Sequence, residues 1–174
     1  MDARGTGSFD NDAAADWLGF LLDHVDDVVL VDTAFDLVAD AAGRADVGRC
    51  QEALAAAELV AAAGHKPCPG IDAEVLAWVE RNWAALWQER RRKALATVRA
   101  ILESSALLEA WRARPDFDAW NVDAGNLVER LSWRGGKQGP VAVPDLCAPS
   151  TWRPRWATTI PSPRLWWSSR TARS

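Results

Sequence analysis

Acidic side chains crowd the first 27 residues of the chain, so the first chemistry to consider is metal binding. Asp10, Asp12 and Asp16 could supply hard oxygen ligands. A histidine beside carboxylates also suits a transition metal, and His24 has such neighbours in Asp23, Asp26 and Asp27. The spacing lacks the glycine and the distal glutamate of an EF-hand loop. We therefore expect solvated acids around a first helix, with no metal or other cofactor, and a carboxylate metal centre is the alternative.

Two glycines precede these acids in the stretch RGTGSFDNDAAADW, and glycines in such a position can form a phosphate-binding loop. Phosphate loops usually also contain a basic side chain and follow a strand. Gly5 and Gly7 have no lysine beside them and three acids after them, which argues against an anion site. We expect the glycines to permit a tight turn, with Phe9 packing near the start of a helix that Asp10 or Asn11 caps.

The other reactive residue types form no recognisable catalytic pattern. His65 and Cys68 in HKPC are half of a zinc pattern without its second half. Cys50 falls on an apolar helical face and is expected in the core. Neither a G-x-S-x-G motif nor a local Ser/His/Asp set occurs, so we predict no catalytic residues. Side chains that are distant in sequence could still meet in space.

A basic run, RRRK, raises the question of nucleic-acid binding. Residues 1–131 contain 13 Lys and Arg against 23 Asp and Glu, which gives a net charge of −10. Phosphate backbones require a basic surface, so nucleic-acid binding by this part of the chain is not expected. We predict instead a solvated helix face, on which Glu89 pairs with Lys93.

The elements that must position these residues are predicted to be helices. Alanine, the strongest helix former, is abundant, and apolar residues recur at helical spacing between glycines and prolines. The clearest helix is CQEALAAAELVAAA, which Gly64 and Pro67 end. Val28 to Val31 is β-branched and could begin a strand, but the apolar spacing after it favours helix. We predict an all-α bundle of about five or six short helices around one core, with Trp83 and Trp87 in that core.

Spaced blocks along the chain resemble a known family. The opening block reads G-x-G-x-F-x-N-D followed by A and D-W, and consists of Gly5, Gly7, Phe9, Asn11, Asp12, Ala14, Asp16 and Trp17. The blocks ALAAAELVAAAGHKP, VLAWV, SALLEAW and FDAWNVDAGNLVERL follow in order. Together they resemble the bacterial domain-of-unknown-function 4259 family over roughly residues 1–131. The resemblance implies a small α-helical domain without assigned catalytic residues, in which the role of the motif residues could be wholly structural.

Composition changes sharply after Leu131. Residues 132–174 contain 7 Arg and Lys against one acid, which gives a net charge of +6, and they hold six of the nine prolines. We predict a helical domain over residues 1–131 and a disordered tail after it. The tail reads like GC-rich DNA translated in a wrong frame, and our hypothesis is that it replaces a native ending. Membrane-surface binding through its tryptophans and arginines is the alternative.

These features favour a binding protein over an enzyme. Acids at positions 2, 10 and 12 stand where a signal peptide would be apolar, and the three cysteines are sparse, so we expect a cytoplasmic protein. We predict a small acidic domain that binds a protein partner without catalysis. Immunity proteins, whose carboxylates neutralise basic toxins, are one such class. The alternatives are a metal-dependent enzyme that uses carboxylates near the N-terminus and membrane binding through the tail.

Overall fold

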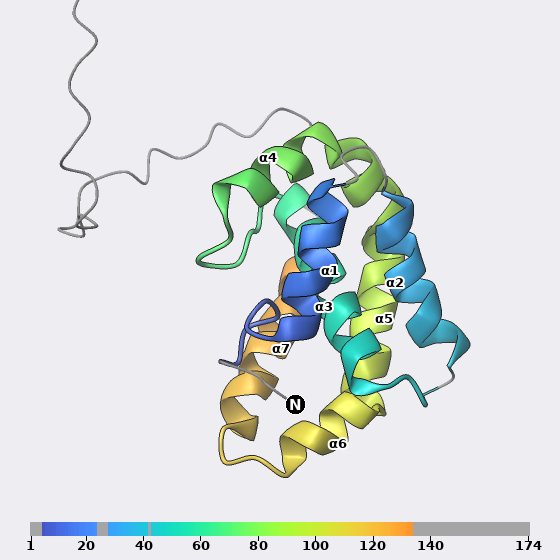
Figure 1. The fold of residues 1–174 in the computed structure, drawn as a ribbon, viewed down its shortest axis with the longest axis vertical. Helices are drawn as coiled ribbons and strands as arrows, with labels where there is room; N and C mark the ends of the chain where they lie inside the picture. The colour runs from blue at the N-terminus through green and yellow to red at the C-terminus, as the bar shows by residue number, and fades with distance from the viewer. Residues whose placement is uncertain (1–4, 24–27, 42, 134–174) are drawn as a thin grey trace, which may run out of the picture. The chain divides into compact units, whose positions relative to one another are not determined.

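The computed structural model describes residues 5–23, 28–41 and 43–133, and over these ranges it is helical without a strand (Figure 1). In chain order the elements are α1 (Asp12–Asp23), α2 (Val29–Asp40), α3 (Val47–Ala63), α4 (Ala73–Arg81), a π-helix η1 (Ala85–Arg90), α5 (Arg91–Glu103), α6 (Ala106–Arg112) and α7 (Phe117–Ser132). The predicted all-α class is confirmed. Apart from Ser132, which ends α7, and Trp133, the predicted tail lies outside the described residues, and the domain boundary at residue 131 stays a prediction.

The described ranges contain seven α-helices rather than the five or six predicted, and one serine explains part of the difference. α5 ends at Glu103, and a separate helix, α6, starts at Ala106. The hydroxyl of the buried Ser105 donates to the carbonyl of Ile101 at 2.9 Å and accepts from the backbone N–H of Leu108 at 3.0 Å. The same hydroxyl thus bonds the end of α5 and caps the start of α6.

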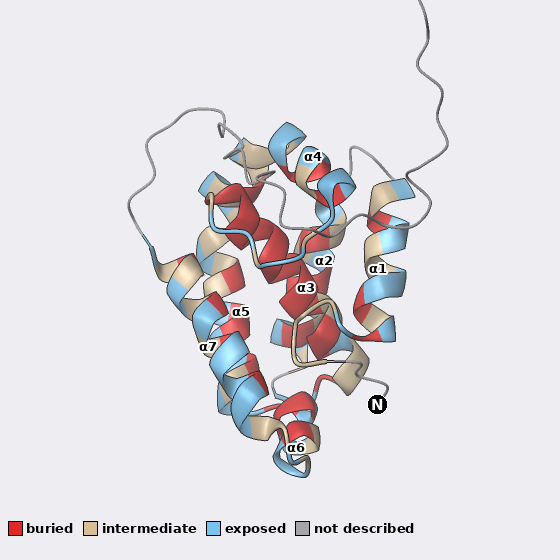
Figure 2. Cartoon of the chain, turned by 90° about the vertical axis from the view of Figure 1, so that its left-hand side faces the viewer, coloured by how far each residue is buried: buried red, intermediate tan, exposed pale blue. Residues whose placement is uncertain are grey.

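α3 is the central helix, and the other helices surround it. It packs on α1, α2, α4, α5, α6 and α7, and on η1. Every residue from Ala53 to Ala63 is buried, so α3 has no solvent-facing side over three turns (Figure 2). The sequence predicted a helix with one apolar face, as is usual for surface helices. Alanine on the remaining faces is what admits neighbours on all sides, because small side chains let helix axes approach closely.

α3 ends in a Schellman motif in which histidine, not glycine, has the left-handed conformation. The backbone N–H of Lys66 bonds the carbonyl of Ala61 at 3.1 Å, and the N–H of His65 bonds that of Ala62 at 2.9 Å. His65 has φ 61°, whereas Gly64 has an ordinary φ of −77°. The prediction that the helix ends at Gly64 is correct. The glycine is required by close packing, since a Cβ there would lie 2.3 Å from the ring of Trp87.

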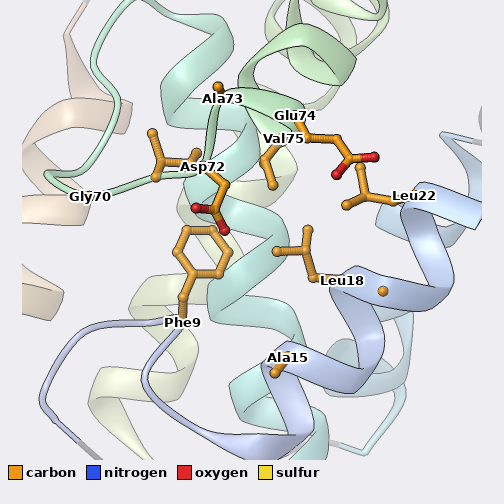
Figure 3. Close-up of a pocket in the computed structure, with 11 residues that line it drawn as sticks. Phe9, Ala15, Leu18, Leu22, Gly70, Asp72, Ala73, Glu74 and Val75 are labelled. Atoms are coloured by element: carbon orange, nitrogen blue, oxygen red, sulfur yellow. The ribbon is translucent and has the colours of Figure 1, made fainter. Parts of the chain in front are cut away.

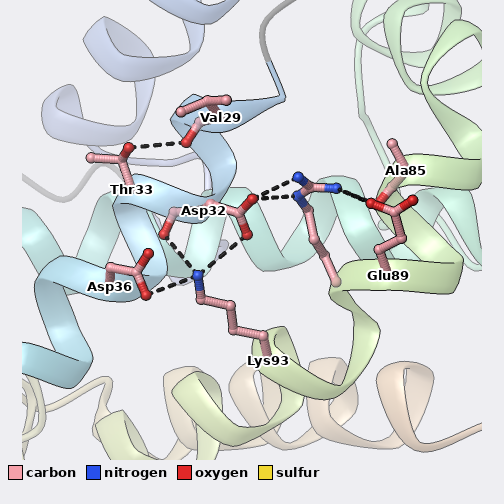
Figure 4. A network of polar contacts seen from close by, with 8 residues as sticks. Val29, Asp32, Thr33, Asp36, Ala85, Glu89 and Lys93 are labelled. Carbon is pink, nitrogen blue, oxygen red and sulfur yellow. Dashed lines mark hydrogen bonds and ion pairs between the residues drawn. The ribbon is translucent and has the colours of Figure 1, made fainter.

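A polar cluster joins α2 to η1 and α5, and it corrects the interpretation of the RRRK run (Figure 4). The guanidinium of Arg90 donates to Asp32 Oδ2 from Nη2 at 2.6 Å and from Nε at 2.9 Å. Lys93 Nζ contacts Asp36 at 2.8 Å and the other oxygen of Asp32 at 3.3 Å. Burial opposes a charged Lys93, but these hydrogen bonds outweigh it and raise its pKa.

The predicted solvated face with a Glu89–Lys93 pair is therefore wrong. Glu89 contacts Arg90 instead, and Arg90 is only 12% exposed at its side chain. Arg91 donates to the carbonyl of Leu131 at 3.1 Å, where it satisfies the C-terminal end of α7. The run therefore holds helices together more than it faces water.

Three other sequence predictions are confirmed by the packing. Residues 29–40 are helical, as the apolar spacing suggested, and Cys50 is fully buried in the core. Trp83 and Trp87 pack against the core while keeping part of their surface exposed.

We predict that Gly64→Ala lowers the free energy of unfolding by about 2 kcal/mol, because the new methyl group must displace the ring of Trp87. Gly125→Ala is the matched control: it lies within α7 with open space around the Cβ position, and should stabilise by about 0.5 kcal/mol. Urea denaturation of both variants measures the difference. Equal effects of the two substitutions would contradict the packing explanation.

Candidate functional site

The family-like motif at the N-terminus forms a turn that starts α1. The carboxylate of Asp10 accepts the backbone N–H of Gly7 at 3.0 Å, and the N–H of Asp10 bonds the carbonyl of Gly7 at 3.1 Å. A Cβ on Gly5 or Gly7 would approach this carboxylate within 2.4 Å or 2.8 Å. Both glycines are therefore explained by contact with Asp10, as the predicted tight turn requires.

Asn11 is the cap of α1, one of the two candidates that the sequence offered. Its side-chain oxygen accepts the backbone N–H of Ala14 at 2.8 Å, and its amide donates to the carbonyl of Ser8 at 3.1 Å. Asp12 and Asp16 are exposed on α1, while Phe9 and Trp17 pack against the core. The bonds of Asp10 and Asn11 thus hold the backbone on both sides of Phe9.

An acidic cleft of about 570 Å³ lies between this N-terminal segment, the loop after α3, and α7. We call it the acidic cleft. Its lining includes Thr6–Asp10, Glu58 of α3, Pro67–Gly70, and Asp123, Asn126, Glu129 and Arg130 of α7. Thr6 anchors the N-terminal segment to α7, since its hydroxyl donates to Asp123 Oδ2 at 2.5 Å.

A buried ion pair forms the inner wall of the acidic cleft. Both terminal nitrogens of Arg130 bond the Glu58 carboxylate, at 2.6 Å and 2.7 Å, and the Glu58 side chain is only 4% exposed. Arg130 also donates to the carbonyl of Lys66 at 3.1 Å, and Ser8 donates to Glu58 at 3.3 Å. Burial lowers and the bonds to Glu58 raise the pKa of Arg130, with a net increase. The pair is bidentate, charged and already satisfied within the protein.

Cys68 lies beside this pair and is kept as a thiol. Burial, followed by the negative charge of Glu58, raises its pKa to about 12. The thiolate is the nucleophile and the metal ligand, so at neutral pH Cys68 is suited to neither role. The two residues of the incomplete HKPC pattern have separate surroundings: His65 terminates α3, and Cys68 faces Glu58.

A second depression, to which several apolar side chains contribute, adjoins the acidic cleft (Figure 3). We call it the apolar groove; it has a volume of about 540 Å³ and lies between α1 and the start of α4. Phe9, Leu18 and Val75 point into it from three different elements (Figure 3). Phe9 and Gly70 line both depressions, so the two depressions adjoin at these residues.

Metal chemistry has little support in the described part of the chain. No group of three or more His, Cys, Asp or Glu side chains in those ranges could hold a metal ion. Of the predicted acidic cluster, Asp23 is exposed at the end of α1, whereas His24, Asp26 and Asp27 lie outside the described residues. The tail arginines and tryptophans proposed for membrane binding also lie outside them. None of the described helices could span a bilayer.

Sequence reasoning missed the main members of the acidic cleft. Glu58, Arg130 and Cys68 come from three separate segments, and only the fold brings them together. One signal for Glu58 was present: a glutamate inside ALAAAELVAAA interrupts an otherwise apolar helix, and a buried carboxylate needs a cationic partner. The identity of that partner could not be read from the sequence.

Comparison with known proteins gives one match. The model of a domain of unknown function, DUF4259, matches residues 2–123. No curated protein and no solved structure matches the chain. The match includes the whole apolar groove and most of the acidic cleft, but it ends before Glu129 and Arg130.

We predict that Arg130→Met lowers the free energy of unfolding by about 3 kcal/mol, because it leaves the Glu58 carboxylate buried without its cation. The double variant Glu58→Met/Arg130→Met should recover most of this loss, since an apolar pair needs no counter-charge. Arg112→Met, which breaks the exposed pair with Glu109, is the control and should cost less than about 1 kcal/mol. A double variant as unstable as Arg130→Met alone would show that the charge is not the cause.

The raised pKa of Cys68 predicts slow alkylation in the native protein. At about pH 8 its thiolate fraction, and hence its rate with iodoacetamide, should be on the order of a thousandfold below that of a thiol with the ordinary pKa of 9.0. Peptide mapping by mass spectrometry gives the rate at Cys68, and urea should restore the ordinary rate. The same shift makes the contribution of Cys68 to stability fall as pH rises above 9.0, since only the unfolded thiol ionises there. Rapid native alkylation at neutral pH would refute the assigned environment.

Proposed function

The chain belongs to the DUF4259 family, whose function is unknown, and we propose that its helical domain is a protein-binding module that acts without catalysis. The observation that carries this proposal is the state of the charged groups in the acidic cleft. Glu58 and Arg130 saturate each other, Asp10 closes the N-terminal turn, and Cys68 is a neutral thiol. Their arrangement favours a rigid wall over a reactive centre.

The rim of the same cleft offers charge to a partner. Asp10, Asp123 and Glu129 are exposed there, and the nearest lining cation, Arg130, is neutralised by Glu58. Clustered uncompensated carboxylates favour basic partners and accelerate their association. A basic toxin neutralised by an immunity-type protein is one partner of this kind, and the acidic body of the chain agrees with that class.

The test is affinity capture from native extract with the full chain, at low and at high salt. We expect the unchanged chain to capture a stoichiometric basic partner. The double variant Asp123→Asn/Glu129→Gln should capture this partner weakly, because its association rate should be reduced about tenfold. The matched control, Glu80→Gln/Glu103→Gln, removes the same charge from exposed sites that line neither the acidic cleft nor the apolar groove.

Two outcomes would count against the proposal. If both variants capture the partner equally and salt has no effect, the partner does not bind through the acidic cleft. A folded chain that captures no stoichiometric partner would argue against a protein-binding role altogether.

A further inference from the structure

We infer that the partner's binding segment carries an apolar side chain next to basic ones, and that it lies across the apolar groove and the acidic cleft together. This inference rests on the proposed function and specifies the chemistry of its partner. It follows from three properties of the two depressions: their continuity, the surface inside the groove, and the charge around both.

Continuity comes from Phe9 and the turn that holds it. Phe9 and Gly70 line both depressions, and Asp10 and Asn11 fix the backbone on both sides of Phe9 through bonds to Gly7, Ser8 and Ala14. A bound segment can therefore pass from one depression to the other beside Phe9. The residues of the opening G-x-G-x-F-x-N-D block thus build this junction.

The apolar groove supplies hydrophobic surface to a ligand. Its lining includes Phe9, Leu18, Leu22 and Ile71, which are only partly buried, above the buried Val75. Each has apolar area still in contact with water, and covering such area is favourable by about 25 cal/mol per Å². An aliphatic or aromatic side chain is the group that gains most there.

The charge around the two depressions indicates which residues flank the apolar side chain of the partner. Five exposed acids line the two depressions: Asp10, Asp72, Glu74, Asp123 and Glu129. Among the described residues that line them, Arg130 is the sole cation, and Glu58 neutralises it. Lysine or arginine side chains complement this rim, whereas nucleic acid and anionic lipid are repelled by it. The complementary partner is therefore a basic peptide segment with an apolar anchor.

Three fluorescein-labelled probe peptides test this with the full chain: Leu-Leu-Gly-Arg-Arg-Arg, the same peptide with serine for leucine, and the same peptide with serine for arginine. Fluorescence polarisation gives the affinities. We expect the first peptide to bind about tenfold more tightly than either of the others. Against the peptide without leucine, this factor corresponds to covering about 55 Å² of apolar surface. Against the peptide without arginine, it comes from contact with the acidic rim.

Substitutions assign each part of the peptide to its depression. Ala15→Arg places a long cation in the apolar groove from an exposed helical position, and should remove the advantage given by leucine. Ala77→Arg, an exposed position on α4 outside both linings, is its matched control and should have no effect. Asp123→Asn/Glu129→Gln should remove the advantage given by arginine. Unchanged circular dichroism verifies that each variant is folded.

The inference is overturned if the leucine and serine peptides bind equally, or if Ala15→Arg and Ala77→Arg have the same effect. Failure of the proposed function is distinguishable from this result. A natural partner that depends on Asp123 and Glu129 but tolerates Ala15→Arg would support protein binding and refute the joint surface. Peptide binding that obeys all the substitutions, without any natural partner, would support the surface chemistry and count against the proposed function.

Discussion

The packing of this domain depends on α3 having no outer face. A helix buried on every side must be narrow, because each bulky side chain would push a neighbouring helix outward. The alanines between positions 53 and 63 meet this requirement, and they let six α-helices and η1 pack around this one helix. The requirement also explains Gly64, which meets the ring of Trp87 at the point where η1 crosses the end of α3.

Glu58 is the exception inside that narrow helix, and it organises the charged part of the molecule. It is the single ionisable side chain among the buried polar residues of the described ranges. A lone buried carboxylate is costly, so α7 must bring a cation to it, and Arg130 supplies two parallel hydrogen bonds. Arg130 turns inward to Glu58, and among the described residues that line the cleft no other cation faces Asp123 and Glu129 on the outer side of α7. The negative charge at the surface of the cleft is thus partly a result of the use of Arg130 to neutralise the buried Glu58.

Two acids of α2 are matched by cations within the fold. Asp32 and Asp36 of α2 meet Arg90 and Lys93, so the acidic stripe of α2 is a contact surface between helices. Net charge alone does not distinguish such a stripe from an exposed binding site. The distinction depends on which helix packs on which face, and that information is absent from local sequence.

The sequence was sufficient for features that depend on local spacing. Helical class, the cap at Asn11 and the core position of Cys50 each follow from residues within one turn or one periodic stripe. It was insufficient where distant segments meet. The role of Gly64 requires Trp87, and the role of Glu58 requires Arg130. The RRRK run was misinterpreted because the partners of Arg90 and Lys93 on α2 lie 57 to 61 residues away. The left-handed His65 was missed for a different reason, since composition favours the neighbouring glycine for that position.

The arrangement of helices around α3 also has a consequence for motion. α1 and α4 pack mainly on α3, whereas α2, α5 and α7 are linked to one another as well as to it. Local opening of α1 or α4 therefore leaves the contacts among α2, α3, α5 and α7 in place, and such peripheral units open at lower free energy than a protein's centre. These are the two helices that flank the apolar groove (Figure 3). The groove can accordingly adjust its width to an incoming side chain while α3 and the Glu58–Arg130 pair keep one wall of the adjoining cleft fixed.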